Sequence, residues 1–196
     1  MAGDLRDVPE SWPIVGTEDF YRTDWVMAFR LDELHRPGDD PGDGTVFPRL
    51  VLEHPGAVIV LAVDDRRRAY CLWQYRHPAQ RRFVELPAGL LDADGESSEE
   101  TARRELREEA GLEADEWTLV GTTWSSPGIS GEVMHFFLAR GLRAVENDDF
   151  ERRHEEADMS GAWVPVDDLR AAVLAGDVGD GPLVQALLLA DAKGLL

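Results

Sequence analysis

Three glutamates within one predicted helical turn are the residues of this sequence best suited to chemistry. Glu105, Glu108 and Glu109 are spaced i, i+3 and i+4. At about 100° per residue, Glu109 lies roughly 40° from Glu105 and Glu108 roughly 60° to the other side. Carboxylates crowded near a helix C-terminus repel one another and oppose the helix dipole. A divalent cation such as Mg²⁺ or Mn²⁺, which prefers oxygen ligands and shares them with substrate phosphates, would offset this cost.

The alternative is a solvated acidic helix face, because Arg103, Arg104 and Arg107 lie among the glutamates and could neutralise them. The charge pattern alone leaves both interpretations open.

The helix itself is well defined by its ends. Ser97 and Glu100 have the spacing of a capping box, which predicts a helix over 98–110. Gly111 suits a left-handed C-terminal cap. Alanines and a leucine recur every four residues between these ends, so the helix has an apolar stripe that can be buried.

The residues around this helix match a longer pattern. Gly89, Glu96 and the run 104–112 follow Gly-x5-Glu-x7-Arg-Glu-U-x-Glu-Glu-x-Gly-U, where U is bulky and aliphatic. This pattern resembles the signature of the Nudix hydrolases. One spacing departs from it, because six residues rather than five separate Gly89 from Glu96. The extra residue precedes the helix, so we expect the arrangement of the carboxylates to survive.

The resemblance implies hydrolysis of a nucleoside diphosphate linked to another group, with Mg²⁺ (or Mn²⁺) as cofactor. It makes Glu105 and Glu109 the principal metal ligands and gives Glu108 a supporting metal-binding and catalytic role. The carbonyl of Ala88 would complete the site. The remaining motif residues would be structural, Arg104 by holding a glutamate in place: Gly89, Glu96, Arg104 and Gly111.

Three further segments resemble the ADP-ribose pyrophosphatase branch, notably its actinobacterial members. They are 85–89, 154–158 and the Ser126–Gly128 turn, whose Pro127 lies sixteen residues beyond Gly111. Ser-Pro-Gly is also ordinary turn chemistry. In this branch a glutamate of the late loop acts as base or last metal ligand, which makes Glu156 the first choice and Glu155 the second, with a solvated loop charge as the alternative for each.

The same branch suggests substrate contacts outside the helix. Arg76 and Arg49 would bind the pyrophosphate or the terminal ribose phosphate, although each could instead form a surface salt bridge. Phe29 or Trp25 could stack on adenine, with core packing as the alternative. The expected reaction converts ADP-ribose to AMP and ribose 5-phosphate. Another nucleoside diphosphate sugar (GDP-mannose or a UDP-sugar) and a non-catalytic nucleotide-sugar sensor stay open.

We expect an α/β fold with two parts. Residues 1–56 predict a β-hairpin subdomain, with strands at 25–31 and 46–52 joined by an acidic turn-rich loop. A hairpin alone is marginally stable, so it should pack on the main domain or on a second copy of the chain, which favours a homodimer. Residues 57–196 predict a Nudix-like α/β/α sandwich with a mixed sheet. The elements expected there, besides the glutamate helix, are strands at 57–63, 69–75, 82–86, 117–124, 133–139 and 163–166, helices at 169–174 (capped by Asp167) and 183–192, and a loop or mobile lid at 146–158.

The amino-acid composition limits the classes of binding partner that the protein could have. The 196 residues include 39 acidic and 20 basic side chains, a net charge of −19. This excess argues against binding to nucleic acid or to anionic membranes. The single cysteine, Cys71, lies in an apolar run and is expected to be buried. Without a basic-then-apolar leader or a run of about 20 apolar residues, the sequence predicts a soluble cytoplasmic protein.

Overall fold

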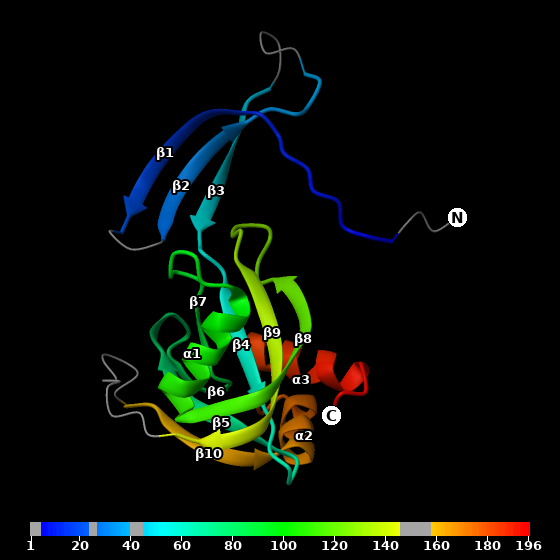
Figure 1. The fold of residues 1–196 in the computed structure, drawn as a ribbon. Helices are drawn as coiled ribbons and strands as arrows, with labels where there is room; N and C mark the ends of the chain where they lie inside the picture. The colour runs from blue at the N-terminus through cyan, green and yellow to red at the C-terminus, as the bar shows by residue number, and fades with distance from the viewer. Residues whose placement is uncertain (1–4, 24–26, 40–44, 146–157) are drawn as a thin grey trace. The chain divides into compact units, whose positions relative to one another are not determined.

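The computed structural model describes residues 5–23, 27–39, 45–145 and 158–196. Its chain divides into two compact units (Figure 1). Unit 1 comprises 1–54 together with 126–131, and unit 2 comprises 55–125 together with 132–196.

Unit 1 is built on a three-stranded antiparallel sheet of order β1-β2-β3. Its strands are β1 (Ile14–Arg22), β2 (Ala28–Leu34) and β3 (Phe47–Glu53). The predicted pairing of the second and third strands is confirmed, with Leu31 opposite Leu50. The segment 126–131 joins this unit through a bridge between Leu52 and Ser130. Among the described residues of unit 1, Ala28 is the one buried hydrophobic side chain, so this sheet has almost no core of its own.

Unit 2 contains two sheets and three helices. A mixed four-stranded sheet has the order β7-β4-β9-β8, with β4 and β9 parallel, and an antiparallel sheet has the order β10-β5-β6. The strands are β4 (Ala57–Ala62), β5 (Arg68–Arg76), β6 (Arg81–Glu85), β7 (Ala88–Leu90), β8 (Leu112–Trp124), β9 (Val133–Ala144) and β10 (Ser160–Pro165). The helices are α1 (Ser98–Ala110), α2 (Val166–Ala175) and α3 (Gly181–Ala192), with a short 3-10 turn at His77–Ala79.

Strand β4 explains why this unit forms layers. Its side chains alternate between the two faces of the sheet, as the pleat of a strand requires. Val58 and Val60 enter a core with Leu106 of α1, whereas Ile59 and Leu61 enter a second core to which α2 and α3 contribute. Figure 1 shows α1 on one face of the sheet and α3 on the other. The predicted α/β sandwich with a mixed sheet is confirmed.

Helix α1 has the predicted bounds and both predicted caps. Ser97 accepts a hydrogen bond from the backbone of Glu100, and the Glu100 carboxylate accepts one from the backbone of Ser97. Gly111 ends the helix with φ at 62°, a conformation that favours glycine. The glutamate turn is therefore fixed at a defined distance from both helix ends.

Three details differ from the sequence-based expectation. Strand β1 was not predicted, because its side chains are almost all exposed and show no alternation of apolar and polar residues. Strand β7, in which Gly89 pairs with Val58, was not among the predicted strands. The predicted cap at Asp167 is wrong: Pro165 precedes the first helical residue of α2, and Asp167 lies inside the first turn, bonded to Arg170.

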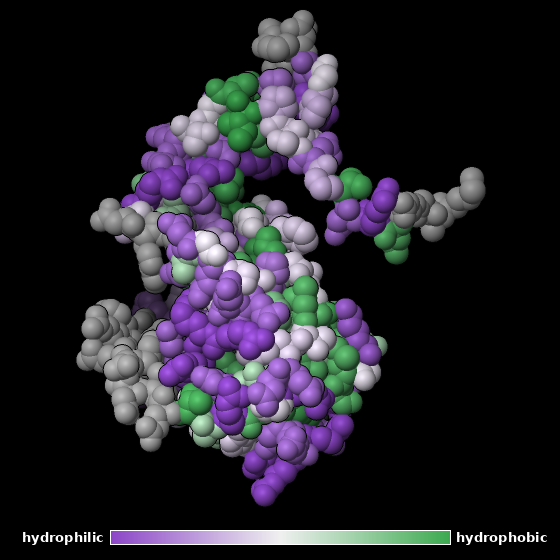
Figure 2. Space-filling view, viewed as in Figure 1, coloured by the Kyte–Doolittle hydropathy of each residue, from purple (hydrophilic) through white to green (hydrophobic). Residues whose placement is uncertain are grey.

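The surface is mainly hydrophilic on the side drawn in Figure 2, with separate hydrophobic patches on both units. Cys71 is fully buried, as predicted, and burial raises the pKa of its thiol to about 12. No helix in the described ranges is long and apolar enough to cross a membrane.

Candidate active site

The three glutamates of α1 differ in their exposure. Glu109 is buried, with 7% of its surface exposed. The Glu105 side chain is 12% exposed and that of Glu108 is 29% exposed. Because two of these carboxylates have lost most of their contact with water, a solvated acidic face does not describe the site.

Arg104 connects the acidic groups around α1. Its Nη1 atom donates to Glu105 at 2.7 Å and to Glu108 at 3.1 Å. Its Nη2 atom donates to Glu96 at 3.2 Å. Burial lowers the pKa of Arg104, but the hydrogen bond to Glu96 and the charges of Glu105 and Glu108 outweigh this effect and raise it. Arg104 thus holds the loop residue Glu96 and the helix glutamates together.

Strand β7 completes this site from the sheet side. The backbone N–H of Ala88 donates to Oε2 of Glu109 at 2.9 Å. A Cβ at Gly89 would overlap the Glu105 side chain, so glycine leaves the space beside the strand that this carboxylate occupies. The two glutamates implied as principal metal ligands therefore lie directly beside Ala88 and Gly89.

The donors present suit a hard divalent cation. Burial raises the pKa of Glu105 to about 7, with Arg104 lowering it and the charges of Glu108 and Asp92 raising it further. A cation beside these carboxylates would favour their ionised form. Within the ranges that the structure describes, no group of three acidic, histidine or cysteine residues is arranged to hold a metal ion, and Arg104 lies against Glu105 and Glu108. Metal binding would therefore compete with Arg104 for Glu105.

Arg76 lies at the end of β5 in a two-point pair with the buried Glu85. Its Nε donates to Glu85 at 2.9 Å and its Nη2 at 2.7 Å. These hydrogen bonds raise the pKa of Arg76, and the charges of Glu109 and Asp180 add to the effect. The side chain is 50% exposed, so Arg76 is fixed in orientation but still accessible. The surface salt bridge considered for Arg76 proves to be a pair with a buried partner.

Glu85 and Asp180 were not among the predicted site residues. Asp180 caps α3, accepting from the backbone of Leu183 at 2.9 Å. Burial raises the pKa of Asp180 to about 6; the Leu183 N–H and Arg76 lower it, and Glu85 raises it. Asp180 has a partial sequence signal, because Asp followed by Gly-Pro is typical of a helix start. For Glu85 no spacing pattern pointed to Arg76.

The remaining predicted residues lie elsewhere. Arg49 on β3 and Phe29 on β2 belong to unit 1, as does the exposed Pro127. Phe29 is 40% exposed, so it is not packed in a core, and the Arg49 guanidinium lies 4.6 Å from the centre of the Phe47 ring. Their roles toward a substrate stay predictions. Three predicted residues fall outside the described ranges: Trp25, Glu155 and Glu156.

Comparisons with known proteins agree with the motif. Residues 53–187 match the NUDIX domain family model. The chain is 41% identical to an ADP-ribose pyrophosphatase of Mycobacterium tuberculosis over 83% of this chain and 75% of that protein. It is 38% identical to an ADP-ribose pyrophosphatase of Bacillus subtilis over 62% and 65%, respectively. The crystal structure of an ADP compounds hydrolase superposes with a TM-score of 0.74 at 20% identity, covering 97% of this chain and all of that one, which supports the fold.

The raised pKa of Glu105 predicts a pH-dependent stability of the metal-free protein. Its carboxyl is protonated more readily when folded (pKa about 7) than when unfolded (about 4.5), so stability is present below pH 4.5 and is lost as pH rises toward 7. We expect the loss to be on the order of 2–3 kcal/mol. The free energy of unfolding is measured by urea denaturation at pH 4.5 and pH 8 in the presence of a chelator. The control is Glu105→Gln, whose amide does not titrate. Equal pH dependence in both proteins would contradict the prediction.

Proposed function

The chain belongs to the Nudix family of hydrolases, and we propose that it hydrolyses the pyrophosphate bond of ADP-ribose to AMP and ribose 5-phosphate. The observation that carries this proposal is the glutamate turn of α1, with Glu105 and Glu109 held against Ala88 and Gly89. The substrate assignment is supported by the two ADP-ribose pyrophosphatase relatives. A sensor without catalysis would have no need to bury adjoining carboxylates at a cost in stability.

We propose Mg²⁺ as the cofactor, held by Glu105 and Glu109 with support from Glu108 and the carbonyl of Ala88. When bound, divalent cations supply positive charge to the bridging phosphates and activate water for attack. They would also make an anionic substrate compatible with a chain of net charge −19.

The chain's own residues prepare this site in distinct ways. Arg104 orients Glu105 and Glu108 by charge-assisted hydrogen bonds. Arg76, fixed by Glu85, directs its exposed part toward the phosphates of the substrate. Glu156, or Glu155 as second choice, takes the proton from the attacking water or completes the metal site.

We assign substrate choice to the N-terminal subdomain and the late loop. Phe29 or Trp25 stacks on the adenine, Arg49 binds a phosphate, and Pro127 shapes the substrate-binding loop. The subdomain also makes the homodimer interface. We place the enzyme in the cytoplasm.

A substrate panel tests the proposed reaction. We expect ADP-ribose with Mg²⁺ to be cleaved fastest, giving AMP and ribose 5-phosphate, ahead of GDP-mannose, UDP-glucose and dinucleoside polyphosphates. Chromatography of the products against standards identifies the bond that is cleaved. Faster cleavage of GDP-mannose or UDP-glucose would assign another nucleotide sugar. If no substrate of the panel is hydrolysed with either Mg²⁺ or Mn²⁺, the result would support the alternative of a non-catalytic nucleotide-sugar sensor.

Substitution of Glu109 separates catalysis from folding. Glu109→Gln keeps an oxygen acceptor for the Ala88 N–H, so the unfolding midpoint should barely change. Loss of the negative charge should lower kcat for ADP-ribose by about 100-fold or more. The matched control is Glu116→Gln, an exposed glutamate of β8, which should keep wild-type kcat. Near-wild-type activity of Glu109→Gln in Mg²⁺ buffer would refute the assigned role.

The homodimer is tested by light scattering. Unit 1 exposes large hydrophobic side chains, with Phe20 58% and Tyr21 66% exposed, and has almost no core of its own. We expect a species of twice 21.8 kDa, which Phe20→Glu shifts toward monomer. Leu174→Glu, at an exposed hydrophobic position of α2, should leave the mass unchanged. A wild-type protein that scatters as 21.8 kDa would rule out the dimer.

A further inference from the structure

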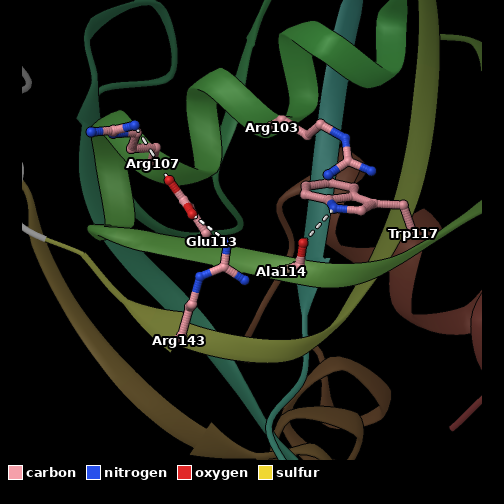
Figure 3. Close-up of a pocket in the computed structure, with 6 residues that line it drawn as sticks. All are labelled: Arg103, Arg107, Glu113, Ala114, Trp117 and Arg143. Atoms are coloured by element: carbon pink, nitrogen blue, oxygen red, sulfur yellow. Dashed lines mark hydrogen bonds and ion pairs between the residues drawn. The ribbon is translucent and has the colours of Figure 1, made fainter.

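A pocket lies on unit 2 along the side of α1 that faces away from the glutamates (Figure 3). Arg103 and Arg107 project from α1 more than 100° around the helix from both Glu105 and Glu109, at about 100° per residue. Strand β8 adds Glu113, Ala114 and Trp117, and β9 adds Arg143. None of these residues has a role in the proposed hydrolysis.

Two of the three arginines of this pocket converge on one carboxylate, whereas Arg103 pairs with Glu99 on its own helix. Arg107 donates to Oε1 of Glu113 at 3.3 Å, and Arg143 donates to Oε2 at 2.6 Å. Figure 3 shows Glu113 between the two guanidinium groups. Arg143 also pairs with Asp115 through its other terminal nitrogen. Helix α1 and strand β9 thereby present guanidinium groups from two sides of one hollow, and strand β8 supplies the carboxylate between them.

The other side of the pocket is aromatic. The Arg103 guanidinium lies 4.9 Å from the centre of the Trp117 ring. The indole N–H donates to the carbonyl of Ala114 at 3.1 Å, and the ring packs edge-on against Phe137. Trp117 is therefore held rigidly, and it supports a flat guanidinium on which a planar ring can stack.

The acidic partners differ in how easily an incoming anion could replace them. The side chain of Asp115 is 72% exposed, whereas that of Glu113 is 31% exposed. An exposed ion pair contributes little to stability, so loss of the Asp115 contact costs little. A phosphate monoester likewise offers several oxygens to a guanidinium fork and forms charge-assisted hydrogen bonds with it. Arg143 can therefore exchange Asp115 for a phosphate while it keeps Glu113.

We propose that this pocket binds a nucleoside monophosphate, with the phosphate on Arg143 beside Arg107 and the base stacked over Arg103. The cavity volume of about 270 Å³ lies just below the usual range for small-molecule sites, about 300–1,000 Å³, which suits one nucleotide better than a whole nucleoside diphosphate sugar. The choice of AMP as the nucleotide rests on the proposed function, because AMP is a product of that reaction. The pocket is then a second site at which the enzyme senses its product.

The test uses full-length protein labelled with 5-fluorotryptophan, in chelator so that turnover plays no part. The sequence contains six tryptophans, so the labelled protein has six ¹⁹F NMR signals. The signal that is missing from the spectrum of Trp117→Phe belongs to Trp117. We expect AMP to shift that signal saturably. Arg143→Gln should weaken binding about tenfold or more. Asp115→Asn should tighten it several-fold, because the competing carboxylate is removed. The charge-matched control Arg66→Gln, at an exposed turn outside the pocket, should bind AMP as the wild type does.

Several outcomes would overturn the proposal. These are the absence of a saturable shift with millimolar AMP, equal affinities in Arg143→Gln and Arg66→Gln, or inorganic phosphate or ribose 5-phosphate binding as tightly as AMP. Circular dichroism and an unchanged kcat for ADP-ribose show that each variant is folded. The experiment distinguishes failure of the proposed function from failure of the proposed AMP site. Turnover of ADP-ribose without AMP binding would refute only the AMP site. AMP binding without turnover of ADP-ribose would refute only the assigned reaction.

Discussion

The repulsion among buried carboxylates is the constraint on which the rest of unit 2 depends. Glu105 and Glu109 lie close together on one helical turn and are mostly withdrawn from water. Arg104 compensates part of this charge, but burial, with a further contribution from the charge of Glu108, still raises the pKa of Glu105 to about 7. A site built in this way is poised to take up positive charge. The folded state is therefore destabilised by these carboxylates, and a bound metal ion would offset that destabilisation. Such strain is common at preorganised binding sites.

The backbone around the glutamates is correspondingly rigid. Strand β4 fixes β7 by pairing Val58 with Gly89, and the same strand buries Val58 and Val60 against α1. Both sides of the site are thus attached to one central strand. The capping box at Ser97 and the C-terminal cap at Gly111 define where α1 begins and ends. They therefore also define the position of the turn that carries the glutamates. Ligands on rigid elements keep their geometry better than ligands on loops.

The sequence was most informative where local rules act alone. Spacing, caps and the four-residue apolar repeat predict α1 from Ser98 to Ala110, and the motif places Arg104 among the glutamates, where it forms its hydrogen bonds. Contacts between distant segments were harder to predict. The pairing of Arg76 with Glu85 depends on strand register, and the proximity of Asp180 depends on how α3 packs. Strand β1 could not be predicted from the sequence, because its exposed residues show no alternation of apolar and polar side chains.

The segment between Gly89 and Glu96 has a consequence for how related proteins are found. Glu96 is held by the side chains of Arg104 and Thr101, and the backbone turn before it closes between Ala93 and Glu96 with Gly95 at a φ of 81°. These anchors fix where the loop ends and leave the path between them free to lengthen. One additional residue is absorbed there without disturbing the helix. A pattern search that demands five intervening residues would overlook this chain, whereas one that scores the anchors and tolerates a variable gap would retrieve it.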